Sequence, residues 1–276
     1  MTDLTVLIPA VDEELHIRRC VESTVGLGPV FVVDGGSRDR TRSIAENAGA
    51  TVVDHPWEGY AAQKNWAIEN LAHDRRWILL LDADEWVTPE LAKEVCSASR
   101  VDRYAGYYIP RKNIFLGRLL KHAWWYPDYQ MRLFRADKGR YEERLVHEHV
   151  LLDGEEGFLK QALMHENLKG IDAFMERHIR YARLEAEEIL RHRRGEIEGQ
   201  RGGRLFGSWP DRRRALKLKV WYRLPGRPAI RFFWMFLVKR GFLDGKQGRI
   251  YCQLIATQDA MVNAKLLELE LAEKKE

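Results

Sequence analysis

The stretch Trp77-Ile-Leu-Leu-Leu-Asp-Ala-Asp-Glu85 passes directly from a short, wholly apolar run into three acidic residues. Apolar runs at 4–9, 30–34 and 50–54 likewise lead into polar or turn residues, a pattern typical of buried parallel strands. Helical periodicity lies between them at 13–25, 39–48 and 60–71, and Thr88-Pro89-Glu90 predicts a fourth helix opening at Leu91. This alternation predicts βαβ units and a mainly parallel sheet flanked by helices.

The alternation stops near residue 104, which predicts a second, different part of the chain. Strands are expected at 107–110, 130–135 and 145–151 in a mixed, aromatic-rich stretch. Helices are expected at 171–194, 211–243 and 246–271. We therefore predict an α/β domain over 1–168 and a helical, basic C-terminal region over 169–276.

The composition limits the class of protein. The 276 residues are 45% hydrophobic and 31% charged, enough for a sizeable core in a soluble protein. The longest apolar run, 232–238, is far below the ~20 residues that cross a bilayer, and the first residues lack the features of a secretion signal. We therefore expect a cytoplasmic protein.

The sequence contains three cysteines, Cys20, Cys96 and Cys252. They form no CxxC pair, which argues against a disulfide framework and a zinc knuckle.

Charge is distributed unevenly along the chain. Residues 1–100 hold 10 basic and 17 acidic residues, whereas residues 201–250 hold 14 basic and 2 acidic ones, a net charge of +12. The acidic part suits a divalent cation. The basic part, which also contains many aromatic residues, suits an anionic surface such as phospholipid, nucleic acid or a phosphorylated glycan.

Asp82 and Asp84 leave the end of the predicted strand two residues apart. In parallel sheets, ligands bind beyond the carboxyl ends of the strands. Both carboxylates can there face one hard cation, Mg²⁺ or Mn²⁺, which also takes oxygen ligands from a diphosphate. The alternative is that one Asp caps the next helix and the other is a solvated turn residue.

Four motifs in order along the chain resemble glycosyltransferase family 2, the inverting, nucleotide-sugar-dependent enzymes with the GT-A fold. They are Leu4-Thr-Val-Leu-Ile-Pro-Ala-Val-Asp-Glu-Glu14, Val32-Val-Asp-Gly-Gly-Ser-Arg-Asp-Arg-Thr41, Gln63-Lys-Asn-Trp66 and Leu79-Leu-Leu-Asp-Ala-Asp-Glu85. The later stretches 126–135, 146–148 and 241–245 resemble the subgroup that contains lipopolysaccharide-core β-glucosyltransferases. Two positions depart from the family: Val11-Asp12 stands where an aromatic and Asn are usual, and Gly35-Gly36 where a second acid or Ser is common.

This resemblance implies a UDP-sugar site. Asp34 would accept a hydrogen bond from the uracil N–H, Gly36 would allow close backbone approach, and Lys64 would reach the base or the phosphates, unless it lies on a solvated helix face. The residues implied to bind the nucleotide-sugar are Pro9, Val11, Glu13, Asp34, Gly36, Ser37, Lys64, Asp82 and Ala83.

The resemblance also implies the catalytic groups. Asp82 and Asp84 would hold the metal, with His165 or His147 as a further contact, although either histidine alone is more often structural. Asp128 is the candidate general base for an inverting transfer, with a turn role next to Pro127 as the alternative. Arg132 would orient that Asp or bind phosphate, or be an ordinary exposed strand residue.

The basic residues between 212 and 240 interleave with aromatic ones, which is compatible with three partners. Such a pattern suits a membrane interface or a lipid-linked acceptor. The charge alone would also suit nucleic acid, but the resemblance to a glycosyltransferase disfavours that partner. In the structural alternative, the apolar stripe packs on the core and the charges are solvated. The stripe at 229–271 also suits burial against a second copy.

We therefore expect a metal-dependent enzyme that moves a hexose from a UDP-sugar to a bacterial glycan or lipid-linked acceptor, peripheral to the cytoplasmic face of the inner membrane. Two alternatives stay open. One is a glycosyltransferase with a protein or small-molecule acceptor, and the other is a non-catalytic binding or scaffold protein with the same fold.

Overall fold

A computed structural model describes residues 3–72, 75–124, 126–142, 149–195, 221–224 and 226–273. The chain forms two compact units, one of residues 1–121 and 125–169 and the other of residues 122–124 and 170–276. The expected strand at 145–151 and helix at 211–243 fall partly outside the described residues.

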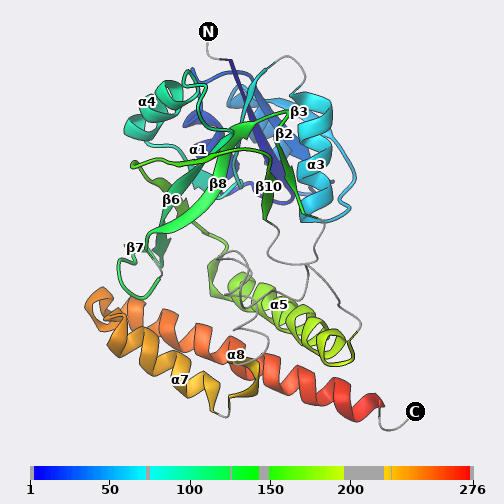
Figure 1. Ribbon diagram of the computed structural model, residues 1–276, viewed down its shortest axis with the longest axis vertical. Coiled ribbons are helices and arrows are strands. Elements are labelled where there is room, and N and C mark those ends of the chain that lie inside the picture. Colours follow the sequence, from blue (N-terminus) through cyan, green and yellow to red (C-terminus); the bar gives the residue numbers. More distant parts are fainter. Residues whose placement is uncertain are drawn as a thin grey trace. The chain divides into compact units, whose positions relative to one another are not determined.

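The first unit is built on a mixed sheet with the strand order β3-β2-β1-β4-β8-β6-β12-β5, and β7 and β11 also pair with β6 (Figure 1). Its strands are β1 (Leu4–Ala10), β2 (Val30–Asp34), β3 (Thr51–Asp54), β4 (Trp77–Leu80), β5 (Glu85–Trp86), β6 (Gly106–Phe115), β7 (Arg118–Leu119), β8 (Asp128–Arg135), β11 (Glu156–Phe158) and β12 (Leu163–Glu166). A separate antiparallel pair consists of β9 (Gly139–Tyr141) and β10 (Val150–Leu152). The helices of this unit are α1 (Ile17–Glu22), α2 (Thr41–Asn47), α3 (Tyr60–Leu71) and α4 (Pro89–Ala98).

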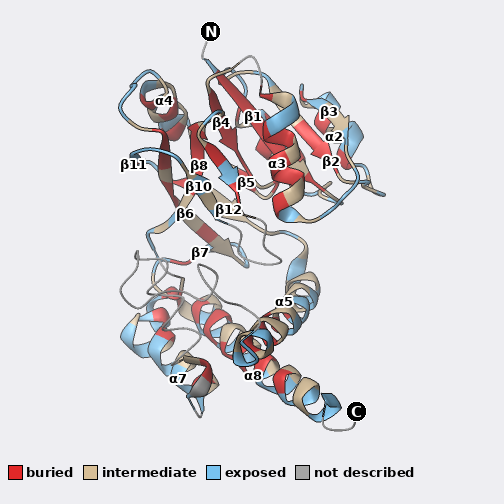
Figure 2. Cartoon of the chain, turned by 45° about the vertical axis from the view of Figure 1, so that its right-hand side comes forward, coloured by how far each residue is buried: buried red, intermediate tan, exposed pale blue. Residues whose placement is uncertain are grey.

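The central strands are buried on both faces, as their apolar runs predict. Alternate residues of β1 enter different cores: Val6 and Ile8 pack with α1 and α4, and Leu7 packs with α3. In Figure 2 the central strands are accordingly coloured as buried. Strand β1 lies parallel to both of its neighbours, with β2 and β3 on one side and β4 on the other, so the strand order changes direction at β1. The carboxyl ends of strands at such a point form the edge at which α/β sheets bind ligands.

The four predicted parallel strands and the helices predicted at 39–48 and 60–71 are confirmed to within about two residues, but α1 is much shorter than predicted. Helical periodicity placed it at 13–25, whereas it begins at Ile17. The backbone N–H groups of Asp12, Glu13 and Glu14 donate instead to side chains of the turn before α2. These bonds hold residues 12–14 against the segment around the start of α2, and the helix begins only at Ile17.

The second unit is helical, as predicted. It contains α5 (Gly170–Arg193), α7 (Arg227–Phe233) and α8 (Gly245–Glu273), with short helical segments at Trp221–Arg223, Trp234–Val238 and Gly241–Asp244. Ala182 and Ala186 of α5 pack with Val262 and Leu266 of α8 in its core. Among the described helices, none is long and apolar enough to cross a membrane.

Candidate active site

Asp82 lies just beyond the carboxyl end of β4, between two cations. Lys64 Nζ from α3 is 3.3 Å from Asp82 Oδ1, and the Arg132 guanidinium from β8 donates to Oδ2. Burial alone would raise the pKa of Asp82, but Arg132, Lys64 and Arg111 hold it well below its ordinary value. Asp82 is therefore a carboxylate at neutral pH.

Glu85 is a buried carboxylate that connects two arginines. Its Oε1 accepts from Arg132 Nη2 at 2.8 Å and from Arg111 Nη1 at 3.1 Å. Its Oε2 accepts from the backbone N–H of Asp82 at 3.0 Å. The side chain has no exposed surface, so its charge is stable there only because both arginines compensate it.

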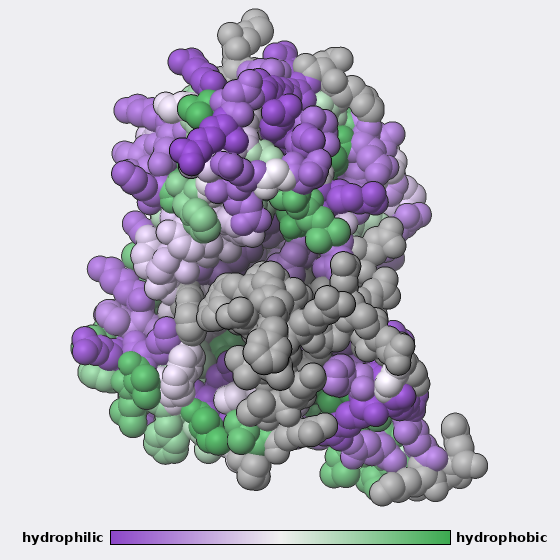
Figure 3. All heavy atoms as spheres, in the orientation of Figure 1, coloured by the Kyte–Doolittle hydropathy of each residue, from purple (hydrophilic) through white to green (hydrophobic). Residues whose placement is uncertain are grey.

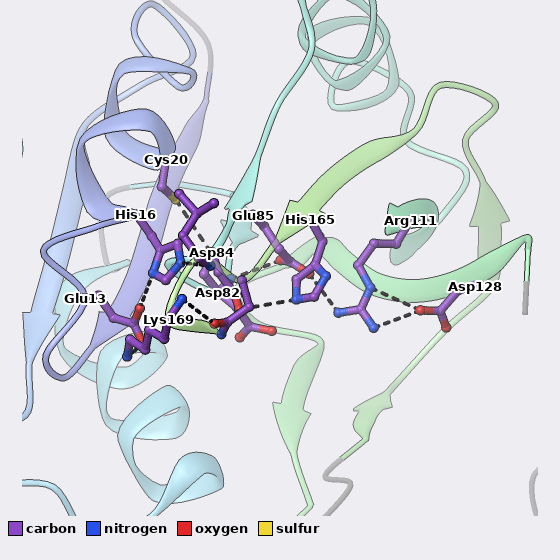
Figure 4. A network of polar contacts seen from close by, with 12 residues as sticks. Glu13, His16, Cys20, Asp82, Asp84, Glu85, Arg111, Asp128, His165 and Lys169 are labelled. Carbon is purple, nitrogen blue, oxygen red and sulfur yellow. Dashed lines mark hydrogen bonds and ion pairs between the residues drawn. The ribbon is translucent and has the colours of Figure 1, made fainter. Parts of the chain in front are cut away.

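Arg111 of β6 extends this arrangement to Asp128 of β8, which is its partner in the sheet register. Arg111 Nε and Nη2 both donate to Asp128 Oδ2, at 3.1 and 2.8 Å, and Gln130 Nε2 donates to Oδ1 at 2.9 Å. Figure 4 shows Arg111 between Glu85 and Asp128. Cations and anions therefore alternate along one network: Lys64, Asp82, Arg132, Glu85, Arg111 and Asp128.

Asp84 and His165 face each other (Figure 4). Strand β12 pairs antiparallel with β5, which sets His165 opposite Glu85. His165 Nε2 is 3.2 Å from Asp84 Oδ2, to which Asn167 Nδ2 also donates at 3.3 Å. Burial alone would raise the pKa of Asp84, but the charge and hydrogen bond of His165 hold it well below its ordinary value.

The turn after β1 is held to the end of the unit. Asp12 has a φ of 52°, in the left-handed region. Asp and Asn adopt this conformation more readily than most residues, so Asp12 can replace the Asn that is usual at this position in glycosyltransferase family 2. Lys169 Nζ and His16 Nδ1 each lie 2.7 Å from an oxygen of Glu13. Because Leu168 N–H donates to His16 Nε2, the ring proton is on Nδ1 and points at Glu13. The carboxylate of Glu13 is thus engaged within the protein.

The turn after β2 contains Asp34, which is buried. Its Oδ1 accepts from the backbone N–H and the hydroxyl of Ser37. Gly36 has φ +96 and open space where a Cβ would stand, whereas a Cβ on Gly35 would meet Val11 Cγ2 at 2.5 Å and Trp57 Cε3 at 3.1 Å. Close packing at this turn therefore occurs at Gly35, which has the Trp57 ring beside it.

Two further predicted residues lie at the same edge of the sheet. Pro9 is half-buried in β1, and Ala83 is buried in the turn between β4 and β5. Lys64 and Arg132 are buried, so neither the solvated helix face nor the exposed strand position that we considered for them is correct. The guanidinium that holds Asp128 belongs to Arg111. His147 lies outside the described residues.

The donor atoms at Asp84 fit a divalent cation, although they do not make a complete site. Within the described ranges, no group of three or more His, Cys, Asp or Glu residues is arranged to hold a metal ion. Asp84 and His165 supply a carboxylate and an imidazole close together, and Asp82 lies two residues away. Carboxylate oxygens suit Mg²⁺ and Mn²⁺, and a diphosphate supplies the oxygens that such an ion still needs.

Sequence reasoning missed Glu85, Arg111 and Trp57. Glu85 is part of the Leu79–Glu85 motif, but nothing along the chain indicates that it is paired with two arginines. Arg111 follows the aromatic run 107–110, and a charge within such a strand is the signal that would have found it. Trp57 lies in a loop without periodicity, so it gave no signal.

Over half of the chain, residues 5–150, matches the family model for glycosyl transferase family 2. The chain belongs to glycosyltransferase family 2. It is therefore a glycosyltransferase, and membership together with the observed mixed sheet flanked by helices confirms the predicted GT-A fold.

Known proteins similar to this chain include a glycosyltransferase of lipopolysaccharide core biosynthesis and solved structures that contain UDP-sugars. LpsC, a lipopolysaccharide core biosynthesis glycosyltransferase of Rhizobium meliloti, is 29% identical over 67% of this chain and 71% of its own. S. aureus TarS residues 1–349, solved with UDP-GlcNAc, has a TM-score of 0.47 and 15% identity over 97% of this chain and 89% of that chain. Glucosyl-3-phosphoglycerate synthase from Mycobacterium tuberculosis, solved with Mn²⁺, UDP-glucose and phosphoglyceric acid, has a TM-score of 0.34 and 20% identity over 40% of this chain and 44% of that chain.

Proposed function

We propose that this family 2 glycosyltransferase moves a hexose from a UDP-sugar, with inversion and with a divalent cation, to a bacterial surface glycan or its lipid-linked precursor. The observation that carries the proposal is the grouping of Asp82, Asp84 and His165 at the end of β4, beside the network that ends on Asp128. The likeness to LpsC supports an acceptor of the lipopolysaccharide-core kind. Such an acceptor would be met at the cytoplasmic face of a membrane.

The nucleotide is assigned to the turns after β1 and β2. Both hydrogen bonds from Ser37 reach Asp34 Oδ1, so we assign the uracil N–H to Oδ2. Position 11 is Val, which gives no aromatic ring on which the base can stack. Trp57 is 40% exposed and packs at the same turn, so it is our candidate for the stacking surface.

The cation is assigned to Asp84 and His165, with Asp82 beside them. When bound, it would neutralise negative charge on the departing UDP. Lys64 and Arg132 hold the Asp82 carboxylate in place, so the acidic turn is rigid before any ligand arrives.

The acceptor is activated by Asp128 in this proposal. Asp128 removes the proton from the acceptor hydroxyl, whose oxygen forms a bond to the anomeric carbon while the bond from that carbon to the UDP oxygen breaks. Arg111 holds Oδ2 with two charged nitrogens, whereas Oδ1 accepts from the neutral Gln130 amide, so we assign the transferred proton to Oδ1. Arg111 is a positioning residue in this scheme, because it acts through Asp128.

The test is UDP release by the purified full chain from a panel of UDP-hexoses, with Mn²⁺ or EDTA, and with or without a bacterial membrane extract as acceptor. We expect metal-dependent release from one UDP-hexose that the extract stimulates. Release that the extract leaves unchanged would favour a protein or small-molecule acceptor. No release from any UDP-sugar would contradict the enzymatic proposal and favour the scaffold alternative.

A further inference from the structure

One surface of the second unit exposes a continuous set of large apolar side chains, which we name the 230–243 surface. It is formed by Ile230, Phe233, Trp234, Leu237, Val238, Phe242 and Leu243, all between 37% and 68% exposed. The first four have the spacing i, i+3, i+4, i+7, which in a globular protein marks the face that a helix turns toward the core. Here that face is turned to solvent, and Figure 3 shows hydrophobic residues gathered over α7 and the segment after it.

The other face of the same segment is anchored inside the unit. Arg227 and Met235 are buried, and Arg227 donates to the backbone carbonyl of Asp259 on α8. Arg231 Nε donates to the Asp259 carboxylate at 2.8 Å. The apolar face is therefore presented outward by a segment that is fixed on its inner side, and it is not a frayed end.

The charges around this surface are of one sign. Within the described residues 226–250, the exposed charged side chains are Arg240, Lys246 and Arg249, and Lys239 lies 5.2 Å over the Trp234 ring. The one acidic residue in that range, Asp244, is buried, where its carboxylate accepts from the N–H groups of His122 and Ala123. The exposed apolar groups of this surface therefore lie beside exposed positive charges, with no exposed acidic residue within the described residues 226–250.

We infer that the 230–243 surface docks on an anionic phospholipid membrane. The apolar side chains enter the boundary between headgroups and acyl chains, and the lysines and arginines around them meet lipid phosphates. A second copy fits less well, because a twofold contact would bring the same cations together with no exposed acid from the described residues 226–250 to pair them. Nucleic acid fits less well, because its backbone gives the exposed aliphatic side chains no apolar partner.

The test is flotation of the full-length protein with vesicles of phosphatidylcholine, with and without phosphatidylglycerol, at low and high salt. We expect at least about tenfold more binding to the vesicles that contain phosphatidylglycerol, with most of this gain lost at high salt. Equal binding to both vesicle types, or none to either, would overturn the inference.

Two double variants separate the apolar from the electrostatic contribution to vesicle binding. Leu237→Ser with Phe242→Ser should lower vesicle binding by about tenfold or more, and Lys246→Glu with Arg249→Glu should remove the preference for phosphatidylglycerol. All four positions are exposed, so both variants should fold, as circular dichroism would verify. Matched controls in the first unit, Val25→Ser and Lys93→Glu with Arg100→Glu, should bind like wild type.

The inference does not depend on the donor site, and the outcomes keep the two separate. Variants of the 230–243 surface should bind UDP like wild type. Undiminished vesicle binding by both double variants would contradict the membrane assignment. So would a wild-type dimer in sedimentation experiments that Leu237→Ser with Phe242→Ser converts to a monomer, because a second copy would then cover this surface.

Discussion

Arg111 reaches one oxygen of Asp128 with two of its nitrogens, Nε at 3.1 Å and Nη2 at 2.8 Å from Oδ2. Arg111 also donates to Glu85, so the guanidinium lies between a buried acid and a partly exposed one. These two bonds hold Asp128 Oδ2 toward Arg111, and Gln130 donates to Oδ1. The candidate base is thus positioned by the protein itself.

Replacement of Asp128 by Asn tests its role as base. The amide has nearly the same shape and still accepts from Arg111, but it cannot take the acceptor proton. We expect UDP binding within about twofold of wild type and a fall in transfer rate of roughly 10²- to 10⁴-fold. Single-turnover transfer and calorimetry measure the two quantities, with the exposed Asp153→Asn as control. An unchanged transfer rate would assign the base to another group.

Replacement of Glu85 by Gln tests the buried network. The variant leaves Arg111 and Arg132 with one carboxylate fewer in a buried environment. Loss of one partner of a buried ion pair costs about 3–5 kcal/mol, whereas the exposed Glu46→Gln should change stability by less than about 0.5 kcal/mol. Urea unfolding gives both values. Equal stability of the two variants would mean that the network contributes nothing to the fold.

Replacement of Trp57 by Ala tests the assignment of the nucleobase. Loss of base stacking should weaken UDP binding by about 1–3 kcal/mol, and Trp57→Phe should restore most of it because a ring is again present. Calorimetric titration of UDP into the three proteins measures the difference. If Trp57→Ala binds UDP as wild type does, the base lies elsewhere.

The lowered pKa of Asp84 predicts a pH dependence of stability. A carboxyl group whose pKa is lower in the folded than in the unfolded protein stabilises the fold above its ordinary value of 3.8, and this contribution is lost as the pH falls from there toward the folded pKa. The free energy of unfolding of wild type should therefore exceed that of Asp84→Asn at neutral pH in the absence of metal. The gap should narrow below about pH 3.8. A gap that does not change with pH would refute the ion-pair account.

Much of the first unit is predictable from sequence because its signals are local. The apolar runs that become β1, β2 and β4 are continuous, since these strands are buried on both faces, and the acids that follow them lie where the strands end. The start of α1 was not predictable, because the bonds that hold residues 12–14 come from the segment around the start of α2.

The contacts within the site depend on pairing between distant strands. Arg111 lies opposite Asp128 because β6 pairs with β8 in one register, and His165 lies opposite Glu85 because β12 pairs with β5. A single sequence does not contain that register. The motifs therefore gave Asp84, Asp128 and His165 as candidates, but not the pairing of Arg111 with Asp128.

Calorimetric titration of UDP into wild type and Asp84→Ala shows whether the turn after β4 binds UDP through a divalent cation. Each protein is titrated with Mn²⁺, with Mg²⁺ and with EDTA. A divalent cation should strengthen UDP binding to wild type by at least about tenfold, the equivalent of 1.4 kcal/mol, and Asp84→Ala should lose this gain while staying folded. Metal-independent binding, or a metal effect that survives in Asp84→Ala, would mean that no cation at this turn holds the UDP.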